Sequence, residues 1–158
     1  MWLDRDGKRT VKSKTLIAKA GNGAWPVGAA EIDGKPFVAL VEGGPDFLAA
    51  WHFLWFCGRW GDVAPVAVLG AGIRVHRDAL PYFAGKGIWT FGHNDGGKGA
   101  AAVFQWTRQL RSAGAAWVKP FDFSAYTLPD RRRCKDLNLL VQCAGFGLGD
   151  EQEEDTHG

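Results

Sequence analysis

The stretch from Phe37 to Asp46, Phe-Val-Ala-Leu-Val-Glu-Gly-Gly-Pro-Asp, runs from an apolar segment through an acid into a helix start. Its five consecutive apolar residues are typical of a strand covered on both faces, as in a parallel sheet flanked by helices. Glu42 follows directly, and ligands bind at the carboxyl ends of strands in open α/β sheets. The two glycines permit a tight turn, and the Pro-Asp pair suits a first helical turn. The acids therefore serve either a site or only the capping of a helix.

Strand and helix patterns alternate from this stretch onward. Further buried strands are predicted at residues 65–69, 88–91 and 116–123, and helices at 45–57, at 77–83 and between residue 100 and Gly114. A last short helix opens at residues 135–138. The sequence thus predicts a Rossmann-like α/β fold with a mostly parallel four-stranded sheet flanked by helices. The Asp33-Gly34 turn signal within residues 29–37 adds a small N-terminal hairpin before the first strand.

Two helices carry apolar residues at helical spacing. In the helix at 45–57 we expect the core-facing stripe to be Phe47, Leu48, Trp51, Leu54 and Trp55. In the helix that ends before Gly114 we expect the buried face to be Ala100, Val103, Phe104, Thr107 and Leu110.

Charge divides the chain into three parts: a basic arm and hairpin at 1–36, an α/β domain at 37–143, and an acidic tail at 144–158 that we expect to be disordered. The five acids of the tail hide a basic body, because leaving them out of the formal net charge of +2 gives +7. A basic body favours a polyanionic partner. The composition, with 46% hydrophobic residues, excludes disorder throughout.

The three cysteines, Cys57, Cys134 and Cys143, form no Cys-x-x-Cys pair and predict no zinc site. Because their number is odd and the amino end has no apolar signal core, we expect reduced thiols and a cytoplasmic location. No apolar stretch approaches the roughly 20 residues that span a bilayer, so no membrane partner is expected.

Acidic side chains follow several of the predicted strands. Right-handed crossovers place every strand-to-helix loop on one edge of the sheet, where Glu42, Asp46, Asp95 and Asp136 can meet. Clustered carboxylates repel one another and need a cation, and hard oxygen ligands suit Mg²⁺ or Mn²⁺. The sequence therefore predicts a metal site at this edge.

The loop from Gly92 to Gly99, Gly-His-Asn-Asp-Gly-Gly-Lys-Gly, nearly matches the phosphate-binding pattern Gly-x4-Gly-Lys-Ser/Thr. Its last residue lacks the hydroxyl that would hold magnesium, which makes a P-loop-like triphosphatase the less favoured alternative. Lys98 is still a candidate for phosphate contact. Arg131, Arg132, Arg133 and Lys135 either form a solvated loop or contact phosphate beside the acidic edge.

Three stretches taken together resemble, in order and spacing, the Toprim domain of topoisomerases and primases. They are Val38 to Asp46, Phe91 to Asp95, and the run Lys135-Asp136-Leu137-Asn138. The resemblance covers about residues 37–143 and is nearest to the primase branch. It implies a magnesium-dependent domain for phosphodiester (nucleotidyl transfer) chemistry in DNA replication.

The resemblance also implies roles for residues and partners. Glu42 would be the catalytic residue, in proton transfer or in organising the metal, Asp95 a metal ligand, and Asp136 a member of the same edge. Single-stranded DNA and nucleotides would be bound, and a helicase or other replication subunits would be protein partners. The alternatives are a catalytically reduced Toprim module that binds nucleic acid or a protein partner, and a Toprim-type nuclease.

His93 departs from the family pattern, because it stands where the first acid of an Asp-x-Asp pair would be. As a metal ligand it would offer a nitrogen, which Mn²⁺ accepts more readily than Mg²⁺. An ordinary histidine is mostly neutral near pH 7.5, so we expect a neutral imidazole at this position.

Overall fold

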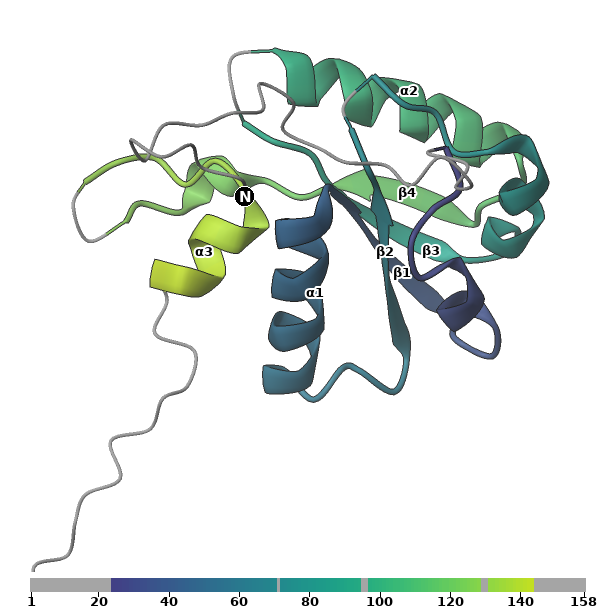
Figure 1. The fold of residues 1–158 in the computed structure, drawn as a ribbon, viewed down its shortest axis with the longest axis horizontal. Coiled ribbons are helices and arrows are strands. Elements are labelled where there is room, and N and C mark those ends of the chain that lie inside the picture. The colour runs from purple at the N-terminus through teal and green to yellow at the C-terminus, as the bar shows by residue number, and fades with distance from the viewer. Residues whose placement is uncertain (1–23, 71, 95–96, 129–130, 144–158) are drawn as a thin grey trace, which may run out of the picture.

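The chain forms a parallel α/β sheet in a computed structural model that describes residues 24–70, 72–94, 97–128 and 131–143 (Figure 1). Its four strands are β1 (Phe37–Glu42), β2 (Val63–Val68), β3 (Gly87–Phe91) and β4 (Trp117–Pro120), in the order β2-β1-β3-β4. All three pairings are parallel, which confirms the predicted fold class. The helices are α1 (Gly44–Phe56), α2 (Lys98–Ser112) and α3 (Leu137–Cys143), with short 3-10 helices η1 (Ala29–Ile32), η2 (Arg77–Phe83) and η3 (Phe123–Ala125).

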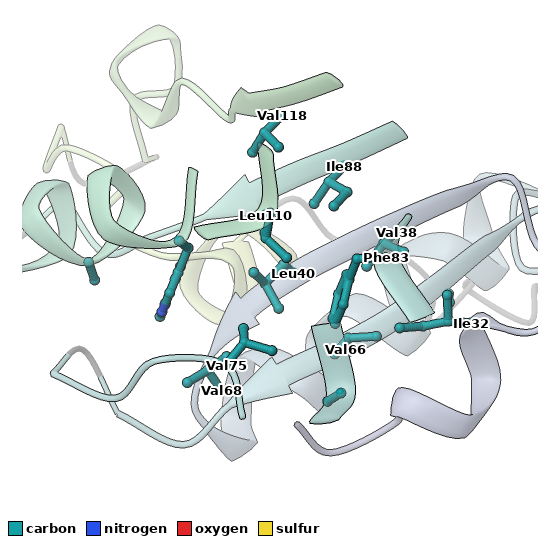
Figure 2. Packing of buried hydrophobic residues seen from close by; sticks show 14 residues of the cluster. Ile32, Val38, Leu40, Val66, Val68, Val75, Phe83, Ile88, Leu110 and Val118 are labelled. Atoms are coloured by element: carbon teal, nitrogen blue, oxygen red, sulfur yellow. The ribbon is translucent and has the colours of Figure 1, made fainter. Parts of the chain in front are cut away.

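Helices cover both faces of the sheet, as Figure 1 shows. α1 and α3 lie together on one face, while α2 lies on the other. Each face has its own hydrophobic cluster. Figure 2 shows the one beneath α2, where Leu40 and Ile88 of the sheet meet Phe83 and Leu110. The central strands are therefore buried on both sides, which is why β1 reads as a continuous apolar run.

The register of the sheet sets the position of the loops. Glu42 pairs with Val68, and Val41 pairs with Phe91, so β1, β2 and β3 end level with one another. The segments that follow these three strands consequently emerge on the same edge. The turn after β1 is held there by a hydrogen bond from the Gly43 N–H to the Val68 carbonyl at 2.9 Å.

The buried faces of two helices differ from the expected ones. In α1 Leu54 is buried, but Leu48 and Trp55 are 69% and 68% exposed. In α2 Leu110 is buried as expected and Val103 and Thr107 are partly buried, but Ala100 and Phe104 are exposed, and Gly99, Ala102 and Trp106 are buried instead. Trp106 is fully buried and its indole N–H donates to the Ile73 carbonyl at 2.9 Å, whereas Phe104 faces outward at 63% exposure.

The expected N-terminal hairpin is wrong in the part that the structure describes. Residues 29–32 form η1 instead of a strand, and the Asp33-Gly34 turn links η1 to β1. The turn itself was predicted correctly, since Gly34 has a φ of 70° and its N–H donates to the Asp33 carboxylate. Residues 1–23 of the basic arm and the acidic tail at 144–158 lie outside the described residues. Within the described residues, no helix is long and apolar enough to cross a membrane.

Helix α2 begins directly against the loop that follows β3. A Cβ atom added to Gly99 would overlap the backbone nitrogen, carbon and oxygen of His93, and one added to Gly92 would overlap Val103. Neither position has room for a side chain, so both require glycine. The close approach brings the first turn of α2 to the edge where β3 ends.

We expect Gly99→Ala to destabilise the protein by about 1–3 kcal/mol, because the added methyl group must displace backbone rather than a flexible side chain. Gly44→Ala is the matched control, since Gly44 also lies at the start of a helix and has no atom within 4 Å of an added Cβ. Urea denaturation of both variants measures the difference. Equal stability of the two variants would contradict this packing.

Candidate functional site at the carboxyl edge of the sheet

A cavity of about 590 Å³ opens at the edge where β1, β2 and β3 end. Three elements place acidic side chains on its wall: Glu42 ends β1, Asp46 lies in the first turn of α1, and Asp136 precedes α3. His93 reaches the same cavity from the loop after β3. The structure thus brings together four of the five predicted metal-site residues. Asp95, the fifth, lies outside the described residues.

Asp46 is buried and hydrogen-bonded through both carboxylate oxygens. Its side chain is 3% exposed. Oδ2 lies 2.6 Å from His93 Nε2, and Oδ1 accepts the Asn138 N–H at 2.8 Å. One carboxylate therefore joins the starts of α1 and α3 to the loop after β3. Asp46 thus positions His93 and the start of α3, and its role as a metal ligand stays a prediction.

His93 carries a positive charge in this setting. The pKa of His93 is raised to about 9, chiefly by the hydrogen bond to Asp46 and also by the negative charges of Glu42, Asp46 and Asp136, while partial burial opposes the shift. The expectation of a neutral imidazole near pH 7.5 is therefore wrong. A protonated imidazole has no lone pair for a metal, so His93 would have to release its proton before it could serve as a ligand.

Glu42 has a buried oxygen without a partner. Its Oε2 atom and the Thr90 hydroxyl are the buried side-chain oxygen or nitrogen atoms for which no described residue supplies a hydrogen bond. A buried carboxylate oxygen is costly to leave unsatisfied, which makes it a site for a cation, a proton or an ordered water. Glu42 is therefore the strongest ligand candidate at this edge.

Asp136 is partly committed to helix capping. Its Oδ1 accepts the Leu139 N–H at 2.7 Å, and its Oδ2 lies 4.0 Å from the exposed Lys135 ammonium group. Mg²⁺ commonly keeps several waters and binds through only one or two carboxylates, so Glu42 and Asp136 fit this mode of binding. Among the described residues, no group of three or more His, Cys, Asp or Glu side chains is arranged to hold a metal ion.

The predicted basic residues Arg131, Arg132, Arg133 and Lys135 are exposed and do not line the cavity. The backbone of Arg132 and Arg133 is held by the Leu128 N–H donating to the Arg132 carbonyl and by the Thr127–Arg133 bridge. The Asn94 N–H donates to the Lys135 carbonyl at 2.7 Å, which ties this loop to the segment that carries His93.

Lys98 is placed differently from the other basic candidates. It is the first residue of α2, is exposed, and does not line the cavity.

Comparison of the chain with protein-family models, with curated proteins and with solved structures finds no significant match. The chemistry of the edge therefore has to be inferred from its own geometry.

Two features of the site were not among the predicted residues. Asn138 lines the cavity and binds Asp46 through its backbone N–H. Its place in the Lys-Asp-Leu-Asn run was a usable signal, although the contact is made by the backbone and not by the amide side chain. The His93–Asp46 pair had no such signal, because the two residues are 47 positions apart.

The raised pKa of His93 predicts how stability depends on pH. The folded-state pKa of about 9 lies above the unfolded value of 6.5, so the stabilisation is complete below pH 6.5 and is lost as pH rises through about 9. Allowing for solvent screening of this partly exposed pair, we expect a loss of about 1–2 kcal/mol that is absent from His93→Gln.

Urea denaturation across this pH range measures the loss, and an NMR titration of the His93 ring measures its pKa. Asp46→Asn is the matched variant, since its amide oxygen can still accept the Asn138 N–H while the negative charge is removed. It should return the pKa of His93 toward the ordinary range. An unshifted pKa in the parent protein would disprove the ion pair.

Proposed function

We propose that this chain is a Toprim-like domain of a primase-type replication protein, which binds a divalent cation and nucleic acid at the carboxyl edge of its sheet. The observation that carries the proposal is the buried, unpartnered oxygen of Glu42 at the end of the central strand. Glu42 lines a cavity that Asp136 and His93 also line. A cation held there would neutralise phosphate charge during phosphodiester chemistry.

The site residues have different roles in this proposal. Glu42 and Asp136 supply oxygen ligands, with Glu42 also in position to accept a proton. Asp46 holds His93, whose positive charge faces the cavity and favours a phosphate oxygen. The exposed arginine loop at 131–133 adds sequence-independent contacts to a nucleic-acid backbone.

One observation favours a second candidate function, a reduced Toprim module that binds phosphate without requiring metal. His93 already places one positive charge among the three carboxylates of the edge. Such a resident cation lowers the need for a bound one. The two functions differ in a measurable way, because only the first requires Mg²⁺ or Mn²⁺ for the interaction with nucleic acid.

We expect His93→Asp to tighten Mg²⁺ binding at least about tenfold, because it replaces a positive charge beside Glu42 with a negative one. Glu42→Gln should abolish binding in the parent background. Calorimetric titration of Mg²⁺ and Mn²⁺ measures both effects, and Arg77→Asp is the control for charge alone, since exposed Arg77 does not line the cavity. If Glu42→Gln leaves the affinity unchanged, the metal site is not at this edge.

We expect the full chain to bind single-stranded DNA with an affinity that falls as salt rises, because phosphate contacts release counterions. Replacing Arg131, Arg132 and Arg133 together by alanine should reduce the slope of log affinity against log salt by about 2–3. Fluorescence anisotropy measures the slope, with Arg77→Ala as the control. An unchanged slope would place the DNA elsewhere, and binding that is equally tight in EDTA would favour the reduced module.

A further inference from the structure

A second cavity, of about 530 Å³, lies on the other side of His93 from the acidic edge. Its walls are helix α2 on one side and the segment after β4, residues 120–124, on the other. His93 lines both cavities, so the two meet at this residue. A ligand in the second cavity would therefore touch the group that borders the proposed phosphate site.

The second cavity has one aromatic surface open to a ligand. Of the three phenylalanines on its wall, Phe123 is buried, and Phe121 is stacked between Phe91 and Tyr126 at ring-centroid distances of 4.8 and 5.6 Å. Phe104 of α2 is 63% exposed. The flat ring available for stacking is therefore the one that sequence periodicity had assigned to the core.

Polar groups stand opposite and beside this ring. Asp122 and Ser124 lie on the facing wall, and Thr107 lies one helical turn after Phe104. The Asp122 carboxylate accepts the Ser124 N–H at 2.9 Å, and hydrogen bonding to Ser124 lowers the pKa of Asp122. A cavity of this size with apolar walls and a few polar groups suits a small organic ligand.

We propose that the second cavity holds a nucleoside unit, with its base stacked on Phe104 and its polar edge facing Asp122 and Thr107. The phosphate attached to that unit would then lie beside His93 at the acidic edge. This inference rests on the proposed function and extends it by naming where the base is held. The nucleoside unit belongs either to a free nucleotide or to a single strand.

A third cavity provides a way to distinguish a free nucleotide from a single strand. It measures about 240 Å³, lies on the opposite flank of α2, and is lined by Phe104, Arg74 and Arg108. The Arg108 guanidinium lies 5.9 Å from the centre of the Phe104 ring. A strand that continues past Phe104 would place its next phosphate near these two arginines, whereas a free nucleotide would end before them.

The test compares two oligonucleotides of equal length and charge, an oligothymidylate and one built of abasic sugar units, by fluorescence anisotropy. The parent should bind the oligothymidylate at least about fivefold more tightly, because stacking contributes per base. Phe104→Ala should remove this preference without changing the affinity for the abasic strand, and Phe104→Trp should keep it. Trp55→Ala is the control, since Trp55 is similarly exposed, at 68%, on α1.

Calorimetry with thymidine triphosphate in Mg²⁺ distinguishes a free nucleotide from a single strand as the occupant of the second cavity. If the cavity receives a single strand, Arg74→Ala with Arg108→Ala weakens oligothymidylate binding and leaves triphosphate binding unchanged. If it receives a free nucleotide, Phe104→Ala weakens triphosphate binding and the arginine changes have no effect on either ligand. Both results support a nucleoside site on Phe104.

Three results would overturn the inference. A parent protein that binds both oligonucleotides equally, and whose triphosphate binding is unchanged by Phe104→Ala, has no base site, while its salt-dependent binding would leave the proposed function standing. A parent protein that binds neither oligonucleotide nor the triphosphate would contradict both this inference and the proposed function. Equal loss of affinity for both oligonucleotides in Phe104→Ala, with the thermal unfolding midpoint unchanged, would show that Phe104 acts without contacting a base.

Discussion

The Asp46 carboxylate holds the working edge of this protein together. It is removed from water at 2% residue exposure, and its two oxygens bind residues that lie 47 and 92 positions away in the chain. A buried carboxylate is tolerated only when it is charge-paired and hydrogen-bonded, and His93 and the Asn138 N–H meet both conditions. Glu42, His93 and Asp136 share one cavity because this side chain joins the elements that carry them.

The same contact decides the electrostatics of the edge. Three carboxylates without a counter-charge would repel one another, and an external cation would be the obvious remedy. Here a histidine supplies part of that charge from within the fold. Asp46 is engaged in holding it, and Glu42 keeps a buried oxygen without a described partner. With three carboxylates and one histidine cation, the edge remains net negative.

Much of this edge could be predicted from the sequence, because strand order and crossover handedness follow general rules. The apolar run of β1 and its closing acid located the edge, and the rules of parallel sheets brought Glu42, His93 and Asp136 to it. The charge state of His93 could not be predicted. It depends on a 2.6 Å contact with Asp46, and no local pattern encodes such a contact.

The errors in the helices have a different origin. Hydrophobic periodicity takes account of apolar residues but not of hydrogen-bond donors. It therefore could not indicate that the Trp106 indole N–H donates to the Ile73 carbonyl beneath α2. With Trp106 fully buried on that side of α2, Phe104 lies at the surface. The burial of Gly99 has a steric cause, the contact between α2 and the His93 backbone, which becomes visible only in three dimensions.

The order of these elements along the chain has a consequence for biosynthesis. All residues that pair β1 with β2 and β3 have been made once residue 91 is added to the chain. The Asn138 N–H, which one oxygen of Asp46 accepts, is made 47 residues later. A nascent chain can therefore form these pairings before the hydrogen bond between Asp46 and α3 exists.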